Sequence, residues 1–252
     1  MNAAPDDDSR AARLAREIEH HRDIAGQAEV IWNWNSPSGR RRAERRARLF
    51  IELAGLAPGG RALELGCGTG LFVEKVAACG VSVTGIDLSP DLLAAARARS
   101  ARLPNVALTS GNAELLPYPA DTFDAVYGSS VLHHLDLDRA LREVARVLKP
   151  GGRVVFTEPN IVNPQVALMF HLGLTKRYFG VSPDEMAFSR FRAARALREA
   201  GLASGRVLPF DFLHPATPAF LLDAVAGLGG LVEKTPLARE IAGSLLLTAR
   251  KP

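Results

Sequence analysis

The feature that most constrains this chain is a glycine-rich turn, LELGCGTG at residues 63–70, which links an apolar run to a helical pattern. Glycines at alternate positions let the backbone turn tightly and approach a ligand where a Cβ would collide, and the helix that follows presents free N–H groups. Glu64 precedes the first glycine, and a second apolar run ends at Asp87. A carboxylate at the end of a second parallel strand can accept both hydroxyls of an adenosine ribose. The pattern therefore predicts a site for an adenosine-containing ligand.

Short apolar runs alternate with helical windows around this turn. Strands are predicted at 61–65, 81–88, 105–113, 123–132 and 151–159, and helices at 71–80, 89–100 and 138–148. Five strands interleaved with helices indicate right-handed βαβ units and a mainly parallel sheet that is covered on both faces. Beyond residue 160 the pattern predicts a helix at 189–200 and strands at 205–210 and 243–249, with irregular apolar segments between them.

The length of 252 residues suits one domain with additions better than two domains. Residues 57–160 carry the α/β core. Residues 1–56, in which a Ser-Pro-Ser-Gly turn precedes a helix at 40–56, are predicted to form an N-terminal helical lid. Residues 161–252 are predicted to add helical cap insertions and the last strands of the same sheet.

Composition argues against several classes of protein. Hydrophobic residues make up 47% and charged residues 23% of the chain, as in ordinary globular proteins and unlike disordered or disulfide-framework chains. The first residues show no apolar core of a secretory signal, and the apolar segment 218–232 is interrupted by Asp223 and by glycines. Two cysteines, Cys67 and Cys79, are typical of free thiols in a reducing compartment, and the position of Cys67 near a helix N-terminus favours a lowered thiol pKa. We expect a cytoplasmic protein with no membrane partner.

Five segments occur in an order that is typical of a known family. They are ELGCGTG at 64–70, GIDLS at 85–89, GNAELLPY at 111–118, FDAVYGSSVLHHL at 123–135 and RVLKPGGRVVF at 146–156. Together they resemble the class I S-adenosylmethionine-dependent methyltransferases over about residues 60–158. The resemblance implies a doubly wound, mainly parallel, seven-stranded Rossmann-like sheet, with S-adenosyl-L-methionine as cofactor and S-adenosyl-L-homocysteine as its product. The third glycine comes one residue earlier than in the G-x-G-x-x-G fingerprint, which disfavours a nicotinamide oxidoreductase.

The resemblance also implies roles for nine residues that match the family's motifs. The methionyl part of the cofactor would border Glu64, Gly66, Cys67, Gly68 and Ser129, the ribose would bind Asp87, and the adenine would lie against Leu88, Asn112 and Ala113. Asn112 departs from the pattern, because the family usually has aspartate there. An asparagine can still accept a hydrogen bond from the adenine amino group through its side-chain oxygen.

Two adjacent histidines, His133 and His134, directly follow the fourth predicted strand, at the sheet edge where the transferred methyl group should point. A neutral imidazole can take the proton of an attacking hydroxyl, so either histidine is a candidate general base. The alternative is that the Leu-His-His-Leu turn that carries them has only a structural role, in packing and capping. Asp136 and Asp138 lie nearby, but we expect one of them to cap the following helix and predict no metal site.

Polar and aromatic residues outside the core motifs are candidates for contact with the methyl acceptor. They are Trp32, Trp34 and Arg40 in the predicted lid, Glu158, Asn160, Asn163 and Gln165 after the fifth strand, and Asp211 and His214 after the sixth. Turn chemistry and plain packing are the alternatives for these residues. Eight of the eleven phenylalanines lie at or after Phe156, which favours a small apolar or aromatic acceptor.

Six arginines between Arg40 and Arg48 are the one argument for a nucleic-acid partner, although the net charge is only +4. On a helix they spread over two stripes, so we expect a solvated face and no nucleic acid. The sequence thus predicts an S-adenosylmethionine-dependent methyltransferase that acts on a small molecule, as in natural product biosynthesis, by O-methylation with a histidine base. An RNA methyltransferase that uses the 40–48 helix and a non-catalytic S-adenosylmethionine-binding module remain alternatives, and a homodimer is compatible with the chain.

Overall fold

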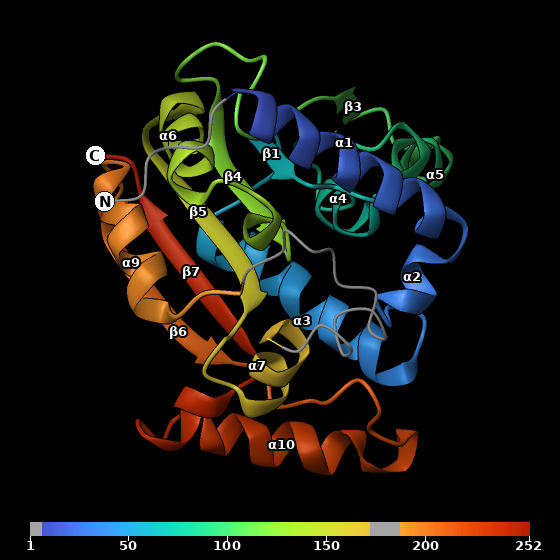
Figure 1. The fold of residues 1–252 in the computed structure, drawn as a ribbon, viewed down its shortest axis with the longest axis vertical. Helices are drawn as coiled ribbons and strands as arrows, with labels where there is room; N and C mark the ends of the chain where they lie inside the picture. The colour runs from blue at the N-terminus through green and yellow to red at the C-terminus, as the bar shows by residue number, and fades with distance from the viewer. Residues whose placement is uncertain (1–6, 172–186) are drawn as a thin grey trace.

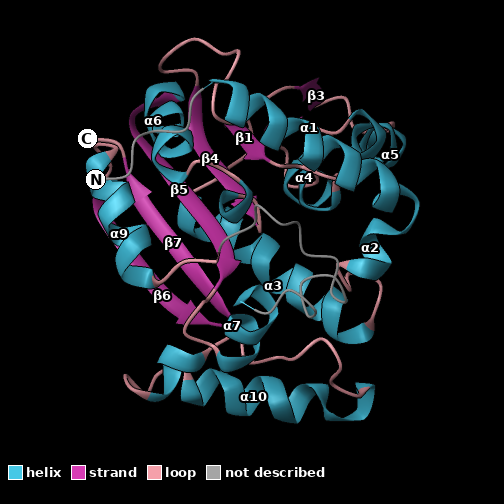
Figure 2. Cartoon of the chain, viewed as in Figure 1, coloured by secondary structure: helices cyan, strands magenta, loops and turns pink. Residues whose placement is uncertain are grey.

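The computed structural model describes residues 7–171 and 187–252 of the chain. Its strands are β1 (Arg61–Leu65), β2 (Ser82–Asp87), β3 (Val106–Ser110), β4 (Phe123–Ser129), β5 (Leu148–Pro159), β6 (Ala203–Phe210) and β7 (Ser244–Arg250). They form one sheet in the order β3-β2-β1-β4-β5-β7-β6, shown in Figures 1 and 2. The strands are parallel except for β7, which runs antiparallel to both of its neighbours. The predicted seven-stranded, mainly parallel α/β sheet is confirmed.

Helices cover both faces of this sheet. The α-helices are α1 (Asp7–Ile24), α2 (Ala28–Ile31), α3 (Pro37–Ala54), α4 (Leu71–Ala77), α5 (Pro90–Ser100), α6 (Leu137–Val147), α7 (Pro164–His171), α9 (Arg190–Glu199) and α10 (Leu222–Val232), with short 3₁₀ turns η1 (Ala25–Gln27), η2 (Leu132–His134), η3 (Ala219–Leu221) and η4 (Ala238–Ile241). Because side chains alternate along a strand, the sheet has two cores. Side chains of α6 and α9 fill one core, and side chains of α3 and α4 fill the other.

The structure moves some predicted boundaries. Helix α3 begins at Pro37 and not at residue 40, because Ser36 is the N-cap, whose side chain accepts a hydrogen bond from Gly39 N, and proline suits the first helical position. The predicted Ser-Pro-Ser-Gly turn is therefore the start of the helix. Part of the segment that we expected to be irregular after β6 is helix α10. The predicted cap at 161–187 lies largely outside the described residues.

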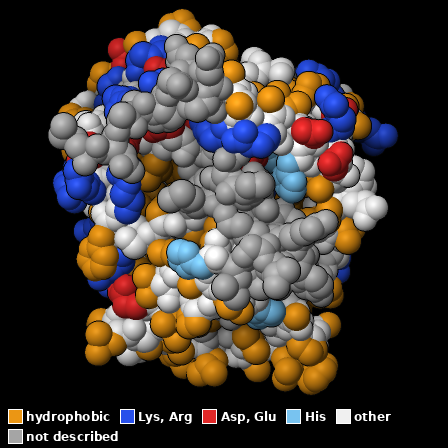
Figure 3. All heavy atoms as spheres, in the orientation of Figure 1, with side chains coloured by type: hydrophobic (Ala, Val, Ile, Leu, Met, Phe, Trp, Pro, Cys, Tyr) orange, Lys and Arg blue, Asp and Glu red, His pale blue; other side chains and the backbone are white. Residues whose placement is uncertain are grey.

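Helix α10 lies along one end of the molecule, at the bottom of Figure 1. Phe220 and Leu237, just outside the two ends of α10, are 84% and 88% exposed, and Leu228 and Leu231 within it are more than half exposed. Figure 3 shows hydrophobic side chains gathered along this edge. Among the described residues, no helix is both long and apolar enough to cross a membrane.

Candidate functional site

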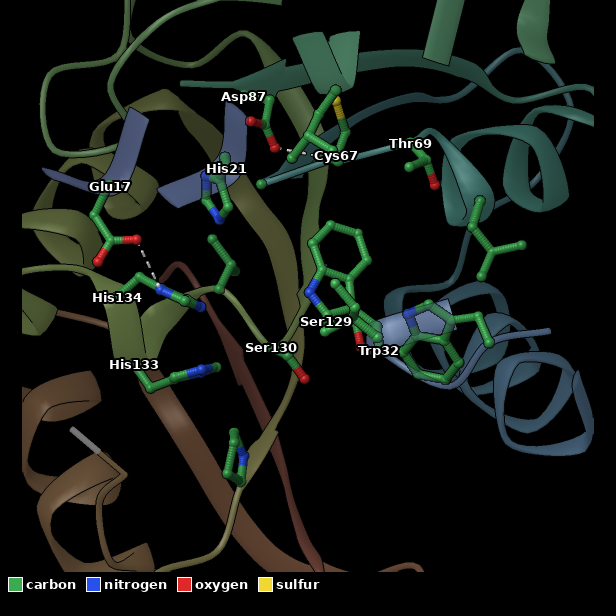
Figure 4. Close-up of a pocket in the computed structure, with 18 of the residues that line it drawn as sticks. Glu17, His21, Trp32, Cys67, Thr69, Asp87, Ser129, Ser130, His133 and His134 are labelled. Carbon is green, nitrogen blue, oxygen red and sulfur yellow. Dashed lines mark hydrogen bonds and ion pairs between the residues drawn. The ribbon is translucent and has the colours of Figure 1, made fainter. Parts of the chain in front are cut away.

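A cavity of about 570 Å³ opens at the carboxyl ends of the central strands. All nine residues that the sequence assigned to the cofactor line it, although they come from several separate segments of the chain: Glu64, Gly66, Cys67, Gly68, Asp87, Leu88, Asn112, Ala113 and Ser129. Figure 4 shows Asp87, Cys67 and Ser129 around this space. The fold therefore brings the predicted cofactor residues together.

The glycine-rich turn after β1 has the backbone conformation that its sequence requires. Gly66 and Gly68 have φ angles of 59° and 51°, which side-chain-bearing residues rarely adopt. A Cβ on Gly66 would lie 2.4 Å from Val131 Cγ2, and one on Gly68 would lie 3.3 Å from the Trp32 ring. The turn is held to the end of β2, because Gly68 N donates a 2.8 Å hydrogen bond to Asp87 Oδ2.

Burial shifts the pKa values of Glu64 and Cys67, which lie beside this turn. Burial, together with the charge of Asp87, raises the pKa of Glu64 well above its usual range, while the Tyr127 phenol opposes that rise. The predicted lowering of the Cys67 pKa is wrong: burial and the neighbouring carboxylates Asp87 and Glu64 raise it. The effect of desolvation exceeds that of the helix N-terminus, so Cys67 stays a neutral thiol.

Asn112 uses its side-chain oxygen within the protein. Oδ1 accepts a 2.8 Å hydrogen bond from Glu114 N, which leaves the amide NH₂ as the free polar group of this side chain. At Asp87, Oδ1 accepts from Ser89 N at 2.9 Å, and each carboxylate oxygen keeps acceptor capacity for a ligand. The residues present fit S-adenosylmethionine: the glycine turn lines the cavity, and beside it the Asp87 carboxylate can accept hydrogen bonds from ribose hydroxyls.

The two candidate bases have different surroundings. His133 Nδ1 lies 2.8 Å from Glu158 Oε2, and the His133 side chain is 5% exposed. His134 Nδ1 lies 3.2 Å from Oε2 of Glu17, a residue of α1. Both histidines line the cavity, and Figure 4 shows the two rings one above the other at its wall.

Glu158 was predicted to contact the acceptor, but it lies behind the cavity wall. Its side chain is fully buried, and Oε1 accepts hydrogen bonds from Val131 N and Leu132 N at 3.0 and 2.9 Å. The same carboxylate holds His133. Glu158 therefore positions the turn after β4 and the imidazole that this turn carries.

Four of the nine predicted acceptor-binding residues line the cavity: Trp32, Trp34, Gln165 and His214. Four more, besides Glu158, lie outside it. Arg40 is exposed and donates to Asn35 O, because its position on α3 faces solvent. Asn160 and Asn163 donate to the backbone carbonyls of Ala242 and Ile241, and so tie the turn after β5 to the segment before β7. Asp211 is buried in an ion-pair cluster.

The arginine helix α3 is only in part the solvated face that the sequence indicated, because Arg41 and Arg48 are exposed but Arg46 is buried. Arg42 Nε lies 3.0 Å from Asp211 Oδ2, and the 3%-exposed Arg46 donates to Ser129 Oγ at 2.8 Å and lies 3.5 Å from the same carboxylate. Arg45 forms two hydrogen bonds with Glu233. Burial, followed by the charge of Arg42, lowers the pKa of Arg46 to about 10. The acids that face α3 lie more than 160 positions away in the sequence, which is why the local pattern could not reveal them.

The N-terminal helix α1 contributes cavity residues that the sequence did not single out. They are Arg13, Leu14, Glu17, His20 and His21. Arg13 binds Glu114 and donates to His134 O. The adjacent histidines in this helix were the only signal, and nothing in the local sequence placed them over the sheet edge.

The remaining wall is apolar where it faces His133. Phe170 of α7 packs edge-on against the His133 ring at 5.8 Å between centroids, and Met169, Pro215 and Trp34 also line the cavity. Asp136 caps α6 by accepting from Arg139 N, as predicted, and Asp138 pairs with Arg192. Among the described residues, no group of three or more His, Cys, Asp or Glu side chains is arranged to hold a metal ion.

Comparisons with known proteins agree with this arrangement. Residues 63–156 match the model of a methyltransferase domain. A demethylmenaquinone methyltransferase from Tropheryma whipplei is 40% identical over 114 residues, which are 44% of this chain and 46% of that protein. The match therefore spans less than half the length of that relative.

Solved structures extend the likeness beyond the core. The [4+2]-cyclase SpnF is 28% identical, with a TM-score of 0.60 over 83% of this chain and 80% of that one. Geranyl diphosphate C-methyltransferase from Streptomyces coelicolor A3(2), crystallised with S-adenosyl-L-homocysteine, shares the fold at 22% identity, with a TM-score of 0.62 over 84% of this chain and 80% of that one. The matched region shows that residues 63–156 form a methyltransferase domain, and the sheet has the fold of S-adenosylmethionine-dependent methyltransferases of known structure.

Proposed function

We propose that the chain binds S-adenosylmethionine in this cavity and methylates a small, largely apolar or aromatic molecule at a hydroxyl oxygen, with His133 as general base. One observation carries the proposal. The nine residues assigned to the cofactor line the same cavity as His133, whose imidazole is held by a buried carboxylate. Natural product biosynthesis is a setting in which such an acceptor would be used.

The apolar wall around His133 supports the acceptor class. Phe170, Met169 and Pro215 offer apolar surface for a ring or hydrocarbon. The relative from Tropheryma whipplei is named for demethylmenaquinone, which agrees with a ring-bearing acceptor. Quinols and phenols are therefore the first acceptors to test.

When bound, S-adenosylmethionine supplies an activated methyl group on a sulfonium. We assign the ring proton of His133 to Nδ1, where it is donated to Glu158, so Nε2 is the basic atom. Nε2 takes the proton of the acceptor hydroxyl as its oxygen attacks. Alignment of the acceptor and exclusion of water contribute most of the acceleration, and the base adds about 10²- to 10⁴-fold.

The test uses methyl-labelled S-adenosylmethionine with a panel of phenols and quinols, followed by mass spectrometry of the product. His133→Asn should lower kcat by about 10²-fold or more, with little change in affinity for S-adenosylhomocysteine. His134→Asn is the matched control and should reduce kcat far less. Equal turnover by the wild type and His133→Asn would exclude the base, and a product methylated at carbon would exclude O-methylation.

A second candidate function is binding of the cofactor without transfer of its methyl group. The likeness to SpnF, a [4+2]-cyclase, favours it, because that protein of similar fold is named for a different reaction. This candidate predicts tight binding of S-adenosylhomocysteine and no labelled product with any acceptor. An RNA methyltransferase has lost its main support, since Arg42, Arg45 and Arg46 are paired within the chain.

A further inference from the structure

Helix α1 places over the cavity an imidazole for which the proposed reaction has no role. His21 lines the cavity, and its Nδ1 atom is buried without a hydrogen-bond partner among the described residues. Figure 4 shows its ring below the Asp87 carboxylate, pointing toward the centre of the cavity. A buried, unpaired ring nitrogen costs free energy. Because this Nδ1 is closed to solvent, the imidazole would meet a ligand in the cavity through its other nitrogen, Nε2.

Hydrogen bonds and ion pairs on both sides of His21 hold α1 and α2 against the rest of the protein. On the N-terminal side, Arg13 binds Glu114, and Glu17 lies 3.2 Å from His134 Nδ1. On the C-terminal side, Glu29 of α2 accepts a 2.7 Å hydrogen bond from Thr69 Oγ1 and pairs with Arg99. Because the backbone is tied at both ends to the body of the protein, the imidazole is held in position before any ligand arrives, which reduces the entropy cost of binding.

The charge state of His21 suits a neutral, hydroxyl-bearing ligand. Burial lowers the pKa of His21, and His134 and His20 lower it further, whereas Asp87 and Glu17 oppose the shift. The ring is therefore neutral at pH 7, with one nitrogen that donates and one that accepts. A ribose hydroxyl both donates and accepts, so it can donate to the Asp87 carboxylate and accept from the imidazole at the same time.

We propose that His21 is a cofactor-binding residue, whose imidazole hydrogen-bonds the ribose hydroxyls of the nucleoside held at Asp87. The inference rests on the proposed function, since it takes S-adenosylmethionine as the ligand of this cavity. It assigns α1 a definite role, because the helix then closes over the adenosine half of the ligand. A histidine that only packs would not distinguish a ribose from a deoxyribose.

The test is calorimetric titration with S-adenosylhomocysteine and with its 2′,3′-dideoxy analogue. His21→Ala should bind S-adenosylhomocysteine about three- to ten-fold more weakly than the wild type, the loss of one hydrogen bond. With the dideoxy analogue, the two proteins should bind equally well. Glu19→Ala, on the exposed outer side of the same helix, is the matched control and should match the wild type with both ligands.

Three results would overturn the proposal. Equal affinity of His21→Ala and the wild type for S-adenosylhomocysteine excludes the contact, and an equal loss with both ligands shows a packing role. If the wild type binds no S-adenosylhomocysteine, the proposed function fails together with the role of His21. If the wild type binds it and His21→Ala binds it equally well, only the role of His21 fails. Should thermal melting show that His21→Ala is unfolded, His21→Gln replaces it; this variant keeps a donor and an acceptor near Nε2 and should bind S-adenosylhomocysteine more tightly than His21→Leu.

Discussion

Asn112 is the residue at which this cavity departs from the pattern of the family that the chain resembles. Its side-chain oxygen accepts a hydrogen bond from Glu114 N, and its amide NH₂ can only donate, whereas the adenine amino group is itself a donor. An aspartate could cap Glu114 N with one oxygen and accept from the adenine with the other. We therefore expect Asn112 to hold an adenine less tightly than an aspartate would.

Asn112→Asp should tighten binding of S-adenosylhomocysteine about two- to ten-fold, the gain of one hydrogen bond, as measured by calorimetry. Asn35→Asp is the control, because Asn35 is exposed and does not line the cavity. Unchanged or weaker binding by Asn112→Asp would show that adenine does not lie against this residue.

In the proposed reaction Glu158 is a positioning residue, and we expect its effect in the pH dependence of kcat/KM. The carboxylate stabilises the protonated form of the imidazole beside it, so Glu158→Gln should move the acidic limb of the kcat/KM profile to lower pH and reduce its maximum. Glu17→Gln removes the carboxylate beside His134 and should leave the limb in place. A lower maximum with an unshifted limb would mean that Glu158 only supports the turn after β4.

The sequence predicted some residues well because their roles are local. The glycine turn, Asp87 and Ala113 fall in short motifs, each directly after a strand, so the motif alone places them at the sheet edge. The roles of Glu158 and Arg46 depend on contacts with residues far away in the sequence, and the same residue type is compatible with a surface position. Local patterns do not carry that information.

Helix α3 is fastened to the end of β6 by a buried cluster of charges. Asp211 is 5% exposed and faces both Arg42 and Arg46. Although burial raises it, these two arginines hold the pKa of Asp211 below its usual value. The cluster also lies beside Trp34, because both guanidinium groups are within 6 Å of its ring. The ion-pair cluster therefore contributes both to the stability of the fold and to the position of Trp34 in the cavity wall.

Asp211→Asn should lower the free energy of unfolding by about 3 kcal/mol at pH 7, because it leaves two buried cations without their carboxylate. Urea denaturation measures this change. Asp223→Asn, which removes the 90%-exposed partner of Arg41, is the control and should cost less than about 1 kcal/mol. A similar small effect from both variants would show that the cluster is not stabilising.

The wild type and Asp211→Asn also test how the contribution of Asp211 to stability depends on pH. The folded-state pKa of Asp211 is lowered, so its contribution is fully present above the unfolded value of about 3.9 and is lost as the pH falls through the folded value. The difference in stability between the wild type and Asp211→Asn should stay constant from pH 5 to pH 8 and shrink below about pH 4. A difference that grew on acidification would contradict this account.

The N-terminal elements were predicted only in part. The composition of the segment that became α3 favours a helix, and the lid was expected in the region of Trp32 and Trp34. The crossing of α1 over the cavity depends on Arg13 and Glu17, whose partners lie more than 100 positions away. Helical periodicity predicts that a helix forms but not what it covers.

The sheet as a whole was predictable because it follows from repeated local units. Each βαβ unit fixes its own handedness, so the alternation of strands and helices indicates a parallel sheet before any long-range contact is known. The antiparallel insertion of β7 between β5 and β6 is not visible in that alternation, and the resemblance to a family implied only a mainly parallel, seven-stranded sheet. The acceptor end of the cavity is the least predictable part, because it is assembled from the lid, α7 and the segment before α10.

A crystal structure of the chain with S-adenosylhomocysteine tests the central claim most directly, because the claim concerns where one ligand lies. The account predicts the adenine against Leu88 and Asn112, the ribose hydroxyls on Asp87, and the sulfur on the side of the cavity that His133 lines. A ligand bound outside this cavity, or inside it with the sulfur directed away from His133, would contradict the account.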